Sequence, residues 1–596
     1  MTSADTPAQR RDRPRRGRLG RRRLVLWILL GLLLVVIVLA LLMAWQAREA
    51  NRHLQSAVGQ APQLRAQVIA GDESAVRRTV TAMGSDTEQA RDALAGPHWR
   101  VATHLPWIGT NAEAMQTVTE VADDLSQEAL PKLIRAAAVL KPNDLNPKGG
   151  RVALEPIRKV QPYVQQSARS TRTADERMAG ISPDDLISPL RSRYMDATSK
   201  VSALSSTMDT VARGTRILPS VLGANGPRRY LVLVQNNSEP RSLGGIAGSV
   251  VELRSNRGRV KLVGQVSGGS FGDFGKPVLP LSKGERALYG PALGQFMVNV
   301  TGTPDFPRSA ELATEMWARK HREHVDGVAA IDPTALSSLL RATGPIRLKS
   351  GQRLTQANAA KVLLNDVYFD FPTNEEQDAF FGRASSAIFD HFIDGDVQTL
   401  TAMDVLAEAT DQGRFMFWSN HQLDRGVLAN TRLSGELDRA GQSEVGVYLH
   451  DVTGSKMGWY EDMDVNVSRE CSEPRKLTVS VSLKSNAPSD PDTLPDYVTG
   501  LRGVVPRGDI ASQLFVYAPP GAKITAFRPT KGPKRADLVT HDGLQATTWP
   551  LELSPGESIT ADYVIESSES LAETTVRTTP GPVDGRFSVS TSQCSE

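Results

Sequence analysis

The chain has 596 residues, 40% of them hydrophobic and 23% charged, a composition typical of globular proteins that bury a sizeable core. Its formal net charge is +3, but residues 1–23 alone carry nine arginines and two aspartates, or +7. The rest of the chain therefore sums to −4, which argues against nucleic-acid binding by the folded part.

An uncharged apolar segment follows the basic tail at residues 24–45, and tryptophans stand near both of its ends, at Trp27 and Trp45. As a helix, its 22 residues would span a hydrocarbon core of about 30 Å. It is longer than the apolar core of a cleaved signal peptide, about 7–15 residues. The sequence thus predicts a single-pass anchor in the cytoplasmic membrane. Residues 1–23 would form a cytoplasmic tail and the C-terminal bulk would lie outside, since arginines favour the inner side.

Residues 46–215 have the pattern of helices. Between Leu186 and Val211, apolar residues recur at spacings of three and four, which places them on one helix face. We expect an extracytoplasmic helical hairpin or bundle that stands on the membrane as a stalk. The same apolar faces could pair between chains, so the oligomeric state stays open.

The composition changes near residue 218. Short apolar runs at 229–234 and 248–253 have the length and content of strands, and a further run follows at 325–331. Helical patterns lie between the later runs. Strands that alternate with helices predict a central α/β domain over residues 218–462.

The last part of the chain has the period of two that is typical of strands. Apolar residues alternate with Thr and Ser between Leu477 and Leu483, and again between Ile559 and Ile565. Turns rich in Gly and Pro separate these runs, so we expect a β-sandwich over residues 465–596. The predicted fold class is therefore multidomain: a single transmembrane helix, a helical stalk or bundle, an α/β domain and a C-terminal β-sandwich.

The two cysteines, Cys471 and Cys594, both fall in this last domain. An external location permits a disulfide, and closing this loop would contribute about 4–5 kcal/mol in the chain-entropy model. A bridge would tie the C-terminus to the start of the domain. Two unpaired thiols are the alternative.

The sequence has no Walker A loop, no HExxH helix and no CxxC motif, so no reaction or metal site is indicated. The densest polar cluster, Asn236, Asn237, Glu239 and Arg241, follows a buried strand, where open α/β sheets place ligands. Amide side chains and a guanidinium could bind phosphate or sugar groups. The same residues could instead form a well hydrogen-bonded turn, and the sequence does not decide between the two.

A second polar cluster contains Asp305 and Arg308 and precedes a predicted helix. Both residues are candidates for ligand binding. The simpler interpretation is that Asp305 caps the helix.

Five sequence motifs stand out around these clusters. They are the run RRYLVLVQNNSEPR at 228–241, Gly244-Gly245 with Gly248-Ser249, the segment 303–308, the pair 325–328 and 331–333, and the segment 447–457. Together they resemble the bacterial domain of unknown function 4012 family, in its actinobacterial form. That family has no established activity, so the resemblance implies membership and not chemistry.

The order of anchor, strand, polar turn and strand also resembles the LytR-CpsA-Psr phosphotransferases, which transfer lipid-linked glycopolymers to peptidoglycan outside the membrane. This resemblance implies a related α/β fold, with arginines and aspartates around a polyprenyl pyrophosphate and a magnesium ion. The position of their first aspartate is held here by Gln235 or Asn236, and Arg241 is the arginine that carries over. Because a neutral turn binds magnesium poorly, the resemblance implies a shared fold more than shared catalysis.

We therefore expect a membrane-anchored, extracytoplasmic cell-envelope protein that binds a cell-wall glycopolymer or a polyprenyl-linked sugar phosphate. One alternative is a divergent glycopolymer phosphotransferase, the only case in which a magnesium cofactor is expected. Another is a structural or interaction protein of an envelope assembly. Whether the protein is an enzyme stays undecided.

Overall fold

The computed structural model describes residues 18–70, 72–106, 108–139, 149–394, 397–437, 443–469, 472–500, 503–571 and 574–592. Contacts within the chain divide it into two compact units. The first, called here the helical unit, comprises Met1–Val139 and Lys159–Ala212. The second, called the sheet unit, comprises Leu140–Arg158 and Arg213–Glu596.

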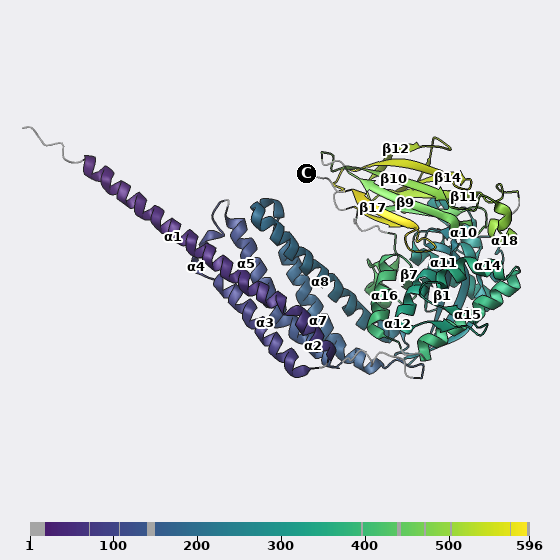
Figure 1. Ribbon diagram of the computed structural model, residues 1–596, viewed down its shortest axis with the longest axis horizontal. Coiled ribbons are helices and arrows are strands. Elements are labelled where there is room, and N and C mark those ends of the chain that lie inside the picture. Colours follow the sequence, from purple (N-terminus) through teal and green to yellow (C-terminus); the bar gives the residue numbers. More distant parts are fainter. Residues whose placement is uncertain are drawn as a thin grey trace, which may run out of the picture. The chain divides into compact units, whose positions relative to one another are not determined.

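The N-terminal part of the chain is rich in helices, as predicted (Figure 1). These are α1 (Arg18–Gly59), α2 (Ala61–Ala70), α3 (Glu73–Ala93), α4 (Pro97–Ala102), α5 (Gly109–Asp124), the π-turn η1 (Leu125–Ala129), α6 (Leu130–Val139), α7 (Leu154–Ala179) and α8 (Ser188–Val221). The last two helices extend beyond the helical unit, and a 3-10 turn, η3 (Pro183–Asp185), lies between them.

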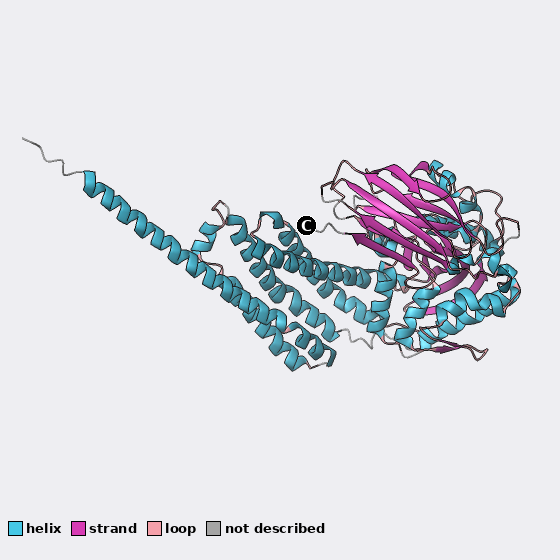
Figure 2. Cartoon of the chain, turned by 45° about the horizontal axis from the view of Figure 1, so that its top comes forward, coloured by secondary structure: helices cyan, strands magenta, loops and turns pink. Residues whose placement is uncertain are grey.

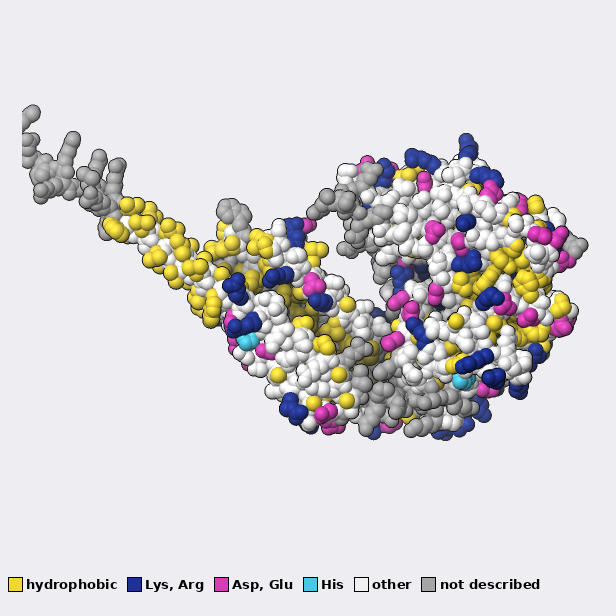
Figure 3. All heavy atoms as spheres, viewed as in Figure 1, with side chains coloured by type: hydrophobic (Ala, Val, Ile, Leu, Met, Phe, Trp, Pro, Cys, Tyr) yellow, Lys and Arg dark blue, Asp and Glu magenta, His cyan; other side chains and the backbone are white. Residues whose placement is uncertain are grey.

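The stretch of α1 from Leu26 to Leu42 is apolar and exposed, and it is mostly yellow in Figure 3. Within the described residues it is the one helical stretch long and apolar enough to cross a membrane. Beyond Trp45, α1 has buried positions: Ala50 and Ala57 are both buried, and Ala50 packs in a core with residues of α3, α4 and α5. The start of α1 is thus a candidate membrane anchor, and its end belongs to the bundle.

Helices α5, α7 and α8 share a core formed by small and medium-sized apolar residues at helical spacing. Ala114 and Val121 come from α5, Met178 comes from α7, and Tyr194 comes from α8. The Tyr194 hydroxyl donates a hydrogen bond to the Met178 carbonyl at 2.7 Å, which satisfies the polar end of a buried ring.

The sheet unit begins with a five-stranded sheet in the order β3-β2-β1-β4-β7. Its strands are β1 (Arg228–Arg241), β2 (Gly244–Asn256), β3 (Arg259–Ser267), β4 (Gly327–Ile331) and β7 (Phe415–Ser419). Strand β1 is central: it pairs antiparallel with β2 and parallel with β4, from Tyr230 opposite Gly327 to Val234 opposite Ile331. A central strand is covered on both faces, which explains its unbroken apolar run.

The two faces of this sheet are covered by different helices. On one face, Leu231 and Leu233 pack against α11 (Phe306–His321). On the other face, Val232 and Ile331 lie below helices that come later in the chain. These are α12 (Pro333–Thr343), α15 (Asn374–Asp394) and α16 (Thr399–Asp411).

The C-terminal part of the chain is rich in strands, as predicted, and Figure 2 shows them as layered magenta arrows. Two five-stranded sheets have the orders β12-β15-β10-β9-β17 and β13-β14-β11-β8-β16. The strands are β8 (Glu444–Asp451), β9 (Glu461–Ser468), β10 (Lys476–Ser485), β11 (Ile510–Tyr517), β12 (Lys523–Pro529), β13 (Asp537–His541), β14 (Leu544–Leu553), β15 (Ser558–Glu566), β16 (Thr575–Thr578) and β17 (Phe587–Ser592). Alternate residues of both sheets, such as Val479, Leu514 and Trp549, form one hydrophobic core.

Strand β8 belongs to this pair of sheets, although its sequence lies inside the segment 218–462 that we expected to form the α/β domain. It pairs antiparallel with β11 and parallel with β16. Val447 and Leu449 point into the common core of the two sheets. A short run that is apolar on both faces shows that a strand is buried, but it does not show which sheet the strand joins.

Shorter elements connect these layers. They are η4 (Gly268–Phe271), α9 (Lys283–Tyr289), α10 (Ala292–Gln295), η5 (Met297–Gly302), β5 (Ile346–Arg347), β6 (Arg353–Leu354), α13 (Ala359–Lys361), η6 (Val362–Asp366), α14 (Val367–Asp370), α17 (Gln422–Leu428), η7 (Arg432–Ser434), η8 (Met457–Tyr460), η9 (Pro491–Thr493) and α18 (Asp496–Thr499).

Candidate functional site

The polar cluster predicted after the first strand lies in the C-terminal half of β1 itself, residues 235–241. The pairing of β1 with β2 is irregular here, with register shifts after Val234 and after Asn236. Two glycines on β2 permit β2 to lie very close to this part of β1. A Cβ atom on Gly245 would lie 2.0 Å from the Asn236 carbonyl oxygen, and one on Gly244, whose φ is +134°, would lie 2.7 Å from the Gln235 side chain. The segment is therefore a tightly packed, irregular strand end and not an open loop.

A buried charge network occupies the end of this segment. Glu239 accepts a hydrogen bond from Nζ of Lys456 at 2.5 Å and lies 3.5 Å from the Arg241 guanidinium. The Arg241 side chain also donates to Oδ1 of Asn299 and to the Asp451 carbonyl, both at 3.1 Å. Glu239 and Lys456 are only 7% and 5% exposed. Such charges are tolerated in a protein interior because each is paired.

The electrostatics of this network keep the lysine charged. Burial lowers the pKa of Lys456, but the Glu239 carboxylate raises it, and the resulting pKa lies above the usual value. The ammonium also lies 5.1 Å from the ring centre of Tyr497, a cation–π distance. The pKa of Asp451 is raised, first by burial and then by the Glu239 charge. The charged groups of the network are thus already paired with one another: Glu239 with Lys456 and Arg241.

Asn237 belongs to a second buried network. Its amide donates to Asp332 at 3.1 Å and to the Pro580 carbonyl at 3.0 Å. Asp332 also accepts from the Arg414 guanidinium at 2.6 Å and caps α12 through the Ala335 N–H at 2.7 Å. Asn237 therefore joins β1 and β4 to the loop after β16, which is a structural role.

Asn236 points to the other face of the strand, on the side of Val232 and Val234. Its amide donates to the Tyr368 hydroxyl, and its Oδ1 accepts from the Ser238 N–H at 3.1 Å. The Asn236 side chain thus makes one hydrogen bond within its own strand segment and one to α14.

Asp305 and Arg308 lie at the start of α11. Arg308 donates to Glu285 at 2.7 Å and to the Pro280 carbonyl at 2.6 Å. Burial raises the pKa of Glu285, but Arg308 outweighs this effect, and the pKa is lowered. Asp305 occupies the capping position, but its carboxylate accepts from the Leu437 N–H at 3.1 Å instead of from the helix.

Of the six predicted ligand-binding residues, the structure brings only Glu239 and Arg241 into an ion pair. Within the described residues, Arg308 shares no hydrogen-bond or ion-pair partner with Arg241 or Asn236. The ligand-binding residues predicted from the sequence do not include Lys456, Asp332 or Arg414. The first two lie inside motifs that we noted only as marks of family resemblance, and Arg414 carries no comparable signal.

The polar cluster does not fit a magnesium ion. Its one inward carboxylate, Glu239, is already neutralised by Lys456 and Arg241, whereas magnesium requires oxygen ligands with free charge. Among the residues that the structure describes, no group of three or more His, Cys, Asp or Glu side chains could hold a metal. Cys471 and Cys594 lie outside the described residues, so their predicted pairing stays a prediction.

A large apolar cavity lies on the face of the first sheet that α12, α15 and α16 cover. Its volume is about 460 Å³. It is lined by Val232, Val234, Val251, Leu253, Leu262, Ile331, Pro333, Leu336, Leu339, Leu363, Phe381, Ala384, Ser385, Ile388, Phe389, Phe392, Ile393, Val397, Thr399, Ala402, Met403 and Leu406. Only Ser385 and Thr399 in this lining carry side-chain polar atoms. The cavity is therefore suited to a hydrocarbon ligand.

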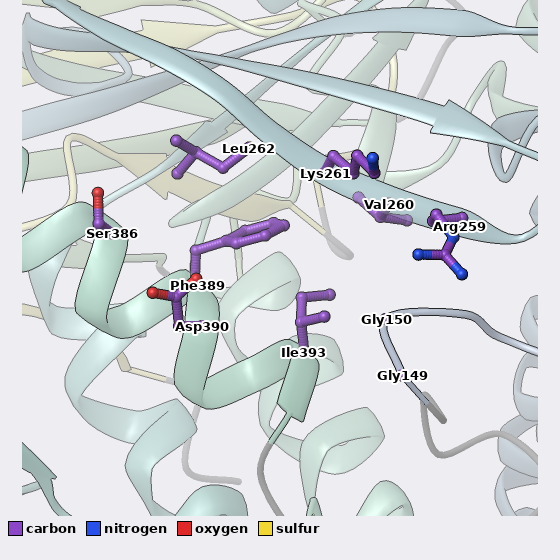
Figure 4. Close-up of a pocket in the computed structure, with 10 residues that line it drawn as sticks. All are labelled: Gly149, Gly150, Arg259, Val260, Lys261, Leu262, Ser386, Phe389, Asp390 and Ile393. Carbon is purple, nitrogen blue, oxygen red and sulfur yellow. The ribbon is translucent and has the colours of Figure 1, made fainter.

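A second hollow, of about 350 Å³, adjoins this cavity and shares Leu262, Phe389 and Ile393 with it. Figure 4 shows Phe389 and Ile393 of α15 pointing toward β3. The remaining lining consists of two glycines, Gly149 and Gly150, the apolar Val260, and the polar or charged residues Arg259, Lys261, Ser386 and Asp390. A continuous region of the sheet unit thus changes from apolar to charged along its length.

Residues 225–368, which contain β1 to β4, match the family model described as Protein of unknown function (DUF4012). The match confirms the resemblance predicted from the motif at 228–241. The comparison with curated proteins found no match, and the comparison with solved structures found none either. The resemblance to LytR-CpsA-Psr phosphotransferases stays a prediction.

Proposed function

We propose that the protein is a membrane-anchored cell-envelope protein that binds a lipid-linked sugar phosphate, with the lipid chain in the apolar cavity of the sheet unit. The observation that carries the proposal is the cavity itself. At about 460 Å³ it falls within the range of about 300–1,000 Å³ that is usual for ligand pockets. Empty apolar cavities stay dry and take up apolar molecules of matching size, because their walls lack dispersion contacts.

The charged hollow beside the cavity supports a ligand with a polar head. Arg259 and Lys261 supply two positive charges there, and within the described part of the chain neither side chain makes an ion pair. Cationic side chains bind phosphate oxygens through charge-assisted hydrogen bonds. Asp390 lies in the same hollow and would face the sugar hydroxyl groups more favourably than the phosphate.

The start of α1 supports the membrane part of the proposal. It would anchor the chain, with the arginine-rich tail in the cytoplasm and the residues after the anchor outside. A lipid-linked sugar phosphate is exposed at that surface, so an anchored protein would meet its ligand in the plane of the membrane.

The ion pairs of the polar turn do not favour phosphoryl transfer. A transferase needs charges that are free to stabilise a reacting phosphate, whereas Arg241, Glu239 and Lys456 neutralise one another. The same contacts connect β1 to the loop after β8, which supports a structural role for the turn.

The proposal is tested by binding of the full chain, in detergent, to a polyprenyl-phosphate sugar, followed by native mass spectrometry. Ala402→Phe places a ring in the cavity from α16 and should abolish binding. Ala407→Phe is the matched control, because Ala407 is exposed on the same helix. Equal binding by wild type and Ala402→Phe, with both proteins folded, would overturn the proposal.

A further inference from the structure

The membrane-proximal end of the helical unit has a feature that an anchor alone does not require. The apolar, exposed part of α1 ends at Trp45, whose side chain is 62% exposed. The next residue, Gln46, already contacts another helix. Its Oε1 accepts a hydrogen bond from the Trp99 indole N–H at 2.8 Å and lies 2.6 Å from Nε2 of His98. Helix α4 is therefore fixed at the level where the candidate anchor ends.

The corner between α4 and α5 presents large apolar side chains to solvent. Val101 is 63% exposed, Leu105 is 44% exposed and Ile108 is 51% exposed. The corner is held by its own backbone, since the Gly109 N–H donates to the Leu105 carbonyl at 2.9 Å. Three aliphatic side chains of this size are usually buried, so their joint exposure at one corner is a feature that needs an explanation.

A second loop lies at the same end of the bundle. The Ile187 N–H, at the junction of α7 and α8, donates to Oδ1 of Asn111 on α5 at 3.0 Å. Ile187 is itself 59% exposed. Two separate loops of the helical unit thus expose aliphatic side chains beside the start of α5.

The corner segment itself carries no acidic residue. Residues 93–112 contain no Asp or Glu, but they contain Arg100. Arg48, on the next turn of α1, is exposed as well. Apolar side chains flanked by cationic ones are the composition of segments that lie in the interface of an anionic bilayer. The loop at Ile187 carries Asp184 and Asp185, so the electrostatic attraction comes from the corner and not from this loop.

We propose that the α4–α5 corner is a second membrane contact, in which Val101, Leu105 and Ile108 insert into the interfacial region of an anionic bilayer. The inference rests on the proposed anchor, because α1 sets the level of the corner. Its consequence is orientation. A single helix leaves a bundle free to tilt, whereas a second contact beside it fixes which side of the helical unit faces the membrane.

The test uses the full chain in nanodiscs of phosphatidylcholine and phosphatidylglycerol in equal parts. A small share of the phosphatidylglycerol carries a diazirine near its glycerol end. After illumination, lipid adducts are assigned by mass spectrometry to peptides from α1, from residues 99–112 and from α3. Adducts on α1 and on 99–112, with none on α3, are the expected result. Adducts on α1 alone would overturn the inference and leave the anchor intact, whereas absence of adducts on α1 would remove the anchor and the inference together.

Variants separate insertion from general proximity. Ile108→Glu should reduce the adducts on 99–112 several-fold and leave those on α1 unchanged. Val58→Glu is the matched control, because Val58 is 65% exposed on α1 but lies thirteen residues beyond Trp45. Replacing phosphatidylglycerol by phosphatidylcholine carrying the same diazirine should weaken labelling of the corner.

Discussion

Lys456 donates a hydrogen bond from Nζ to Oε2 of Glu239 at 2.5 Å, although the two residues are 217 positions apart in the chain. Glu239 lies near the end of β1, the central strand of the first sheet, and Lys456 lies in the loop after β8, a strand of the paired C-terminal sheets. Both side chains are buried. The ion pair therefore joins the two layered parts of the sheet unit, and its contribution should appear in stability rather than in ligand binding.

Removing one member of this pair should destabilise the sheet unit strongly. Lys456→Met leaves the Glu239 carboxylate buried with Arg241 as its remaining cation, and loss of one partner of a buried pair costs about 3–5 kcal/mol. We expect a clear fall in the Tm of the sheet unit by calorimetry. The matched control is Lys531→Met, which breaks an exposed pair with Glu557 and should cost about 0–1 kcal/mol. The double variant Glu239→Gln with Lys456→Met should recover part of the loss, and equal effects of the two lysine variants would contradict this account.

A buried carboxyl group makes stability fall as the pH rises. Burial raises the pKa of Glu461 from 4.5 to about 8; Ser512 lowers it through hydrogen bonding, and the charges of Asp451 and Asp462 raise it. Between these values the unfolded chain releases a proton that the folded chain keeps, so the free energy of unfolding decreases from pH 4.5 to about 8 and then levels off. One pKa unit corresponds to about 1.4 kcal/mol.

Glu461→Gln tests this pH dependence. The amide keeps a hydrogen-bonding group beside Ser512, which lies 3.3 Å from both carboxylate oxygens, but it does not ionise. The variant should be more stable than wild type at pH 8–9, and this advantage should shrink as the pH approaches 5. Denaturant unfolding at several pH values measures the difference. An advantage that does not change with pH would show that Glu461 ionises normally in the folded protein.

Gly245 permits the close approach of β2 to the polar turn. Because an added Cβ would lie 2.0 Å from the Asn236 carbonyl oxygen, Gly245→Ala must displace one of the two strands. Overpacking of this kind costs about 1–3 kcal/mol and occasionally more. Gly264→Ala on the adjacent strand is the control, since no atom lies within 4 Å of its Cβ position. A lower Tm for the first variant alone is expected, and similar Tm values would mean that the register of the hairpin adjusts freely.

Much of the secondary structure could be predicted from the sequence, because periodicity is a local property. The alternation from Leu477 to Leu483 marks β10, and the apolar stripe from Leu186 to Val211 marks α8. The partner of each strand is not local. Strand β8 gives no sign that it pairs with β11 and β16, and β17 pairs in parallel with β9 from the end of the described chain.

The candidate site was less predictable for the same reason. Asn236, Asn237, Glu239 and Arg241 do form a dense polar cluster, but each also has a partner from a segment more than fifty residues away, such as the loop at Lys456. The apolar cavity has no motif at all. It is formed by three helices and a sheet face, each of which has an ordinary amphipathic pattern.

The polar turn and the charged hollow should separate in a binding experiment. Arg241→Met should lower the Tm, because Asn299 and the Asp451 carbonyl lose a donor, but the folded protein should bind a polyprenyl-phosphate sugar with unchanged affinity. Lys261→Glu should do the opposite. The Tm should stay unchanged because the side chain is exposed. Binding should weaken about tenfold or more, since a charge-assisted hydrogen bond contributes about 1.5–3 kcal/mol.

The control for charge alone is Lys320→Glu, at an exposed position of α11 on the other face of the first sheet. It changes the net charge by the same amount and should leave the affinity as it is. Affinities are measured by fluorescence anisotropy at a temperature where all variants are folded. Loss of binding in Arg241→Met, with Lys261→Glu unaffected, would move the headgroup site to the turn at the end of β1, because only a direct contact could then explain the loss.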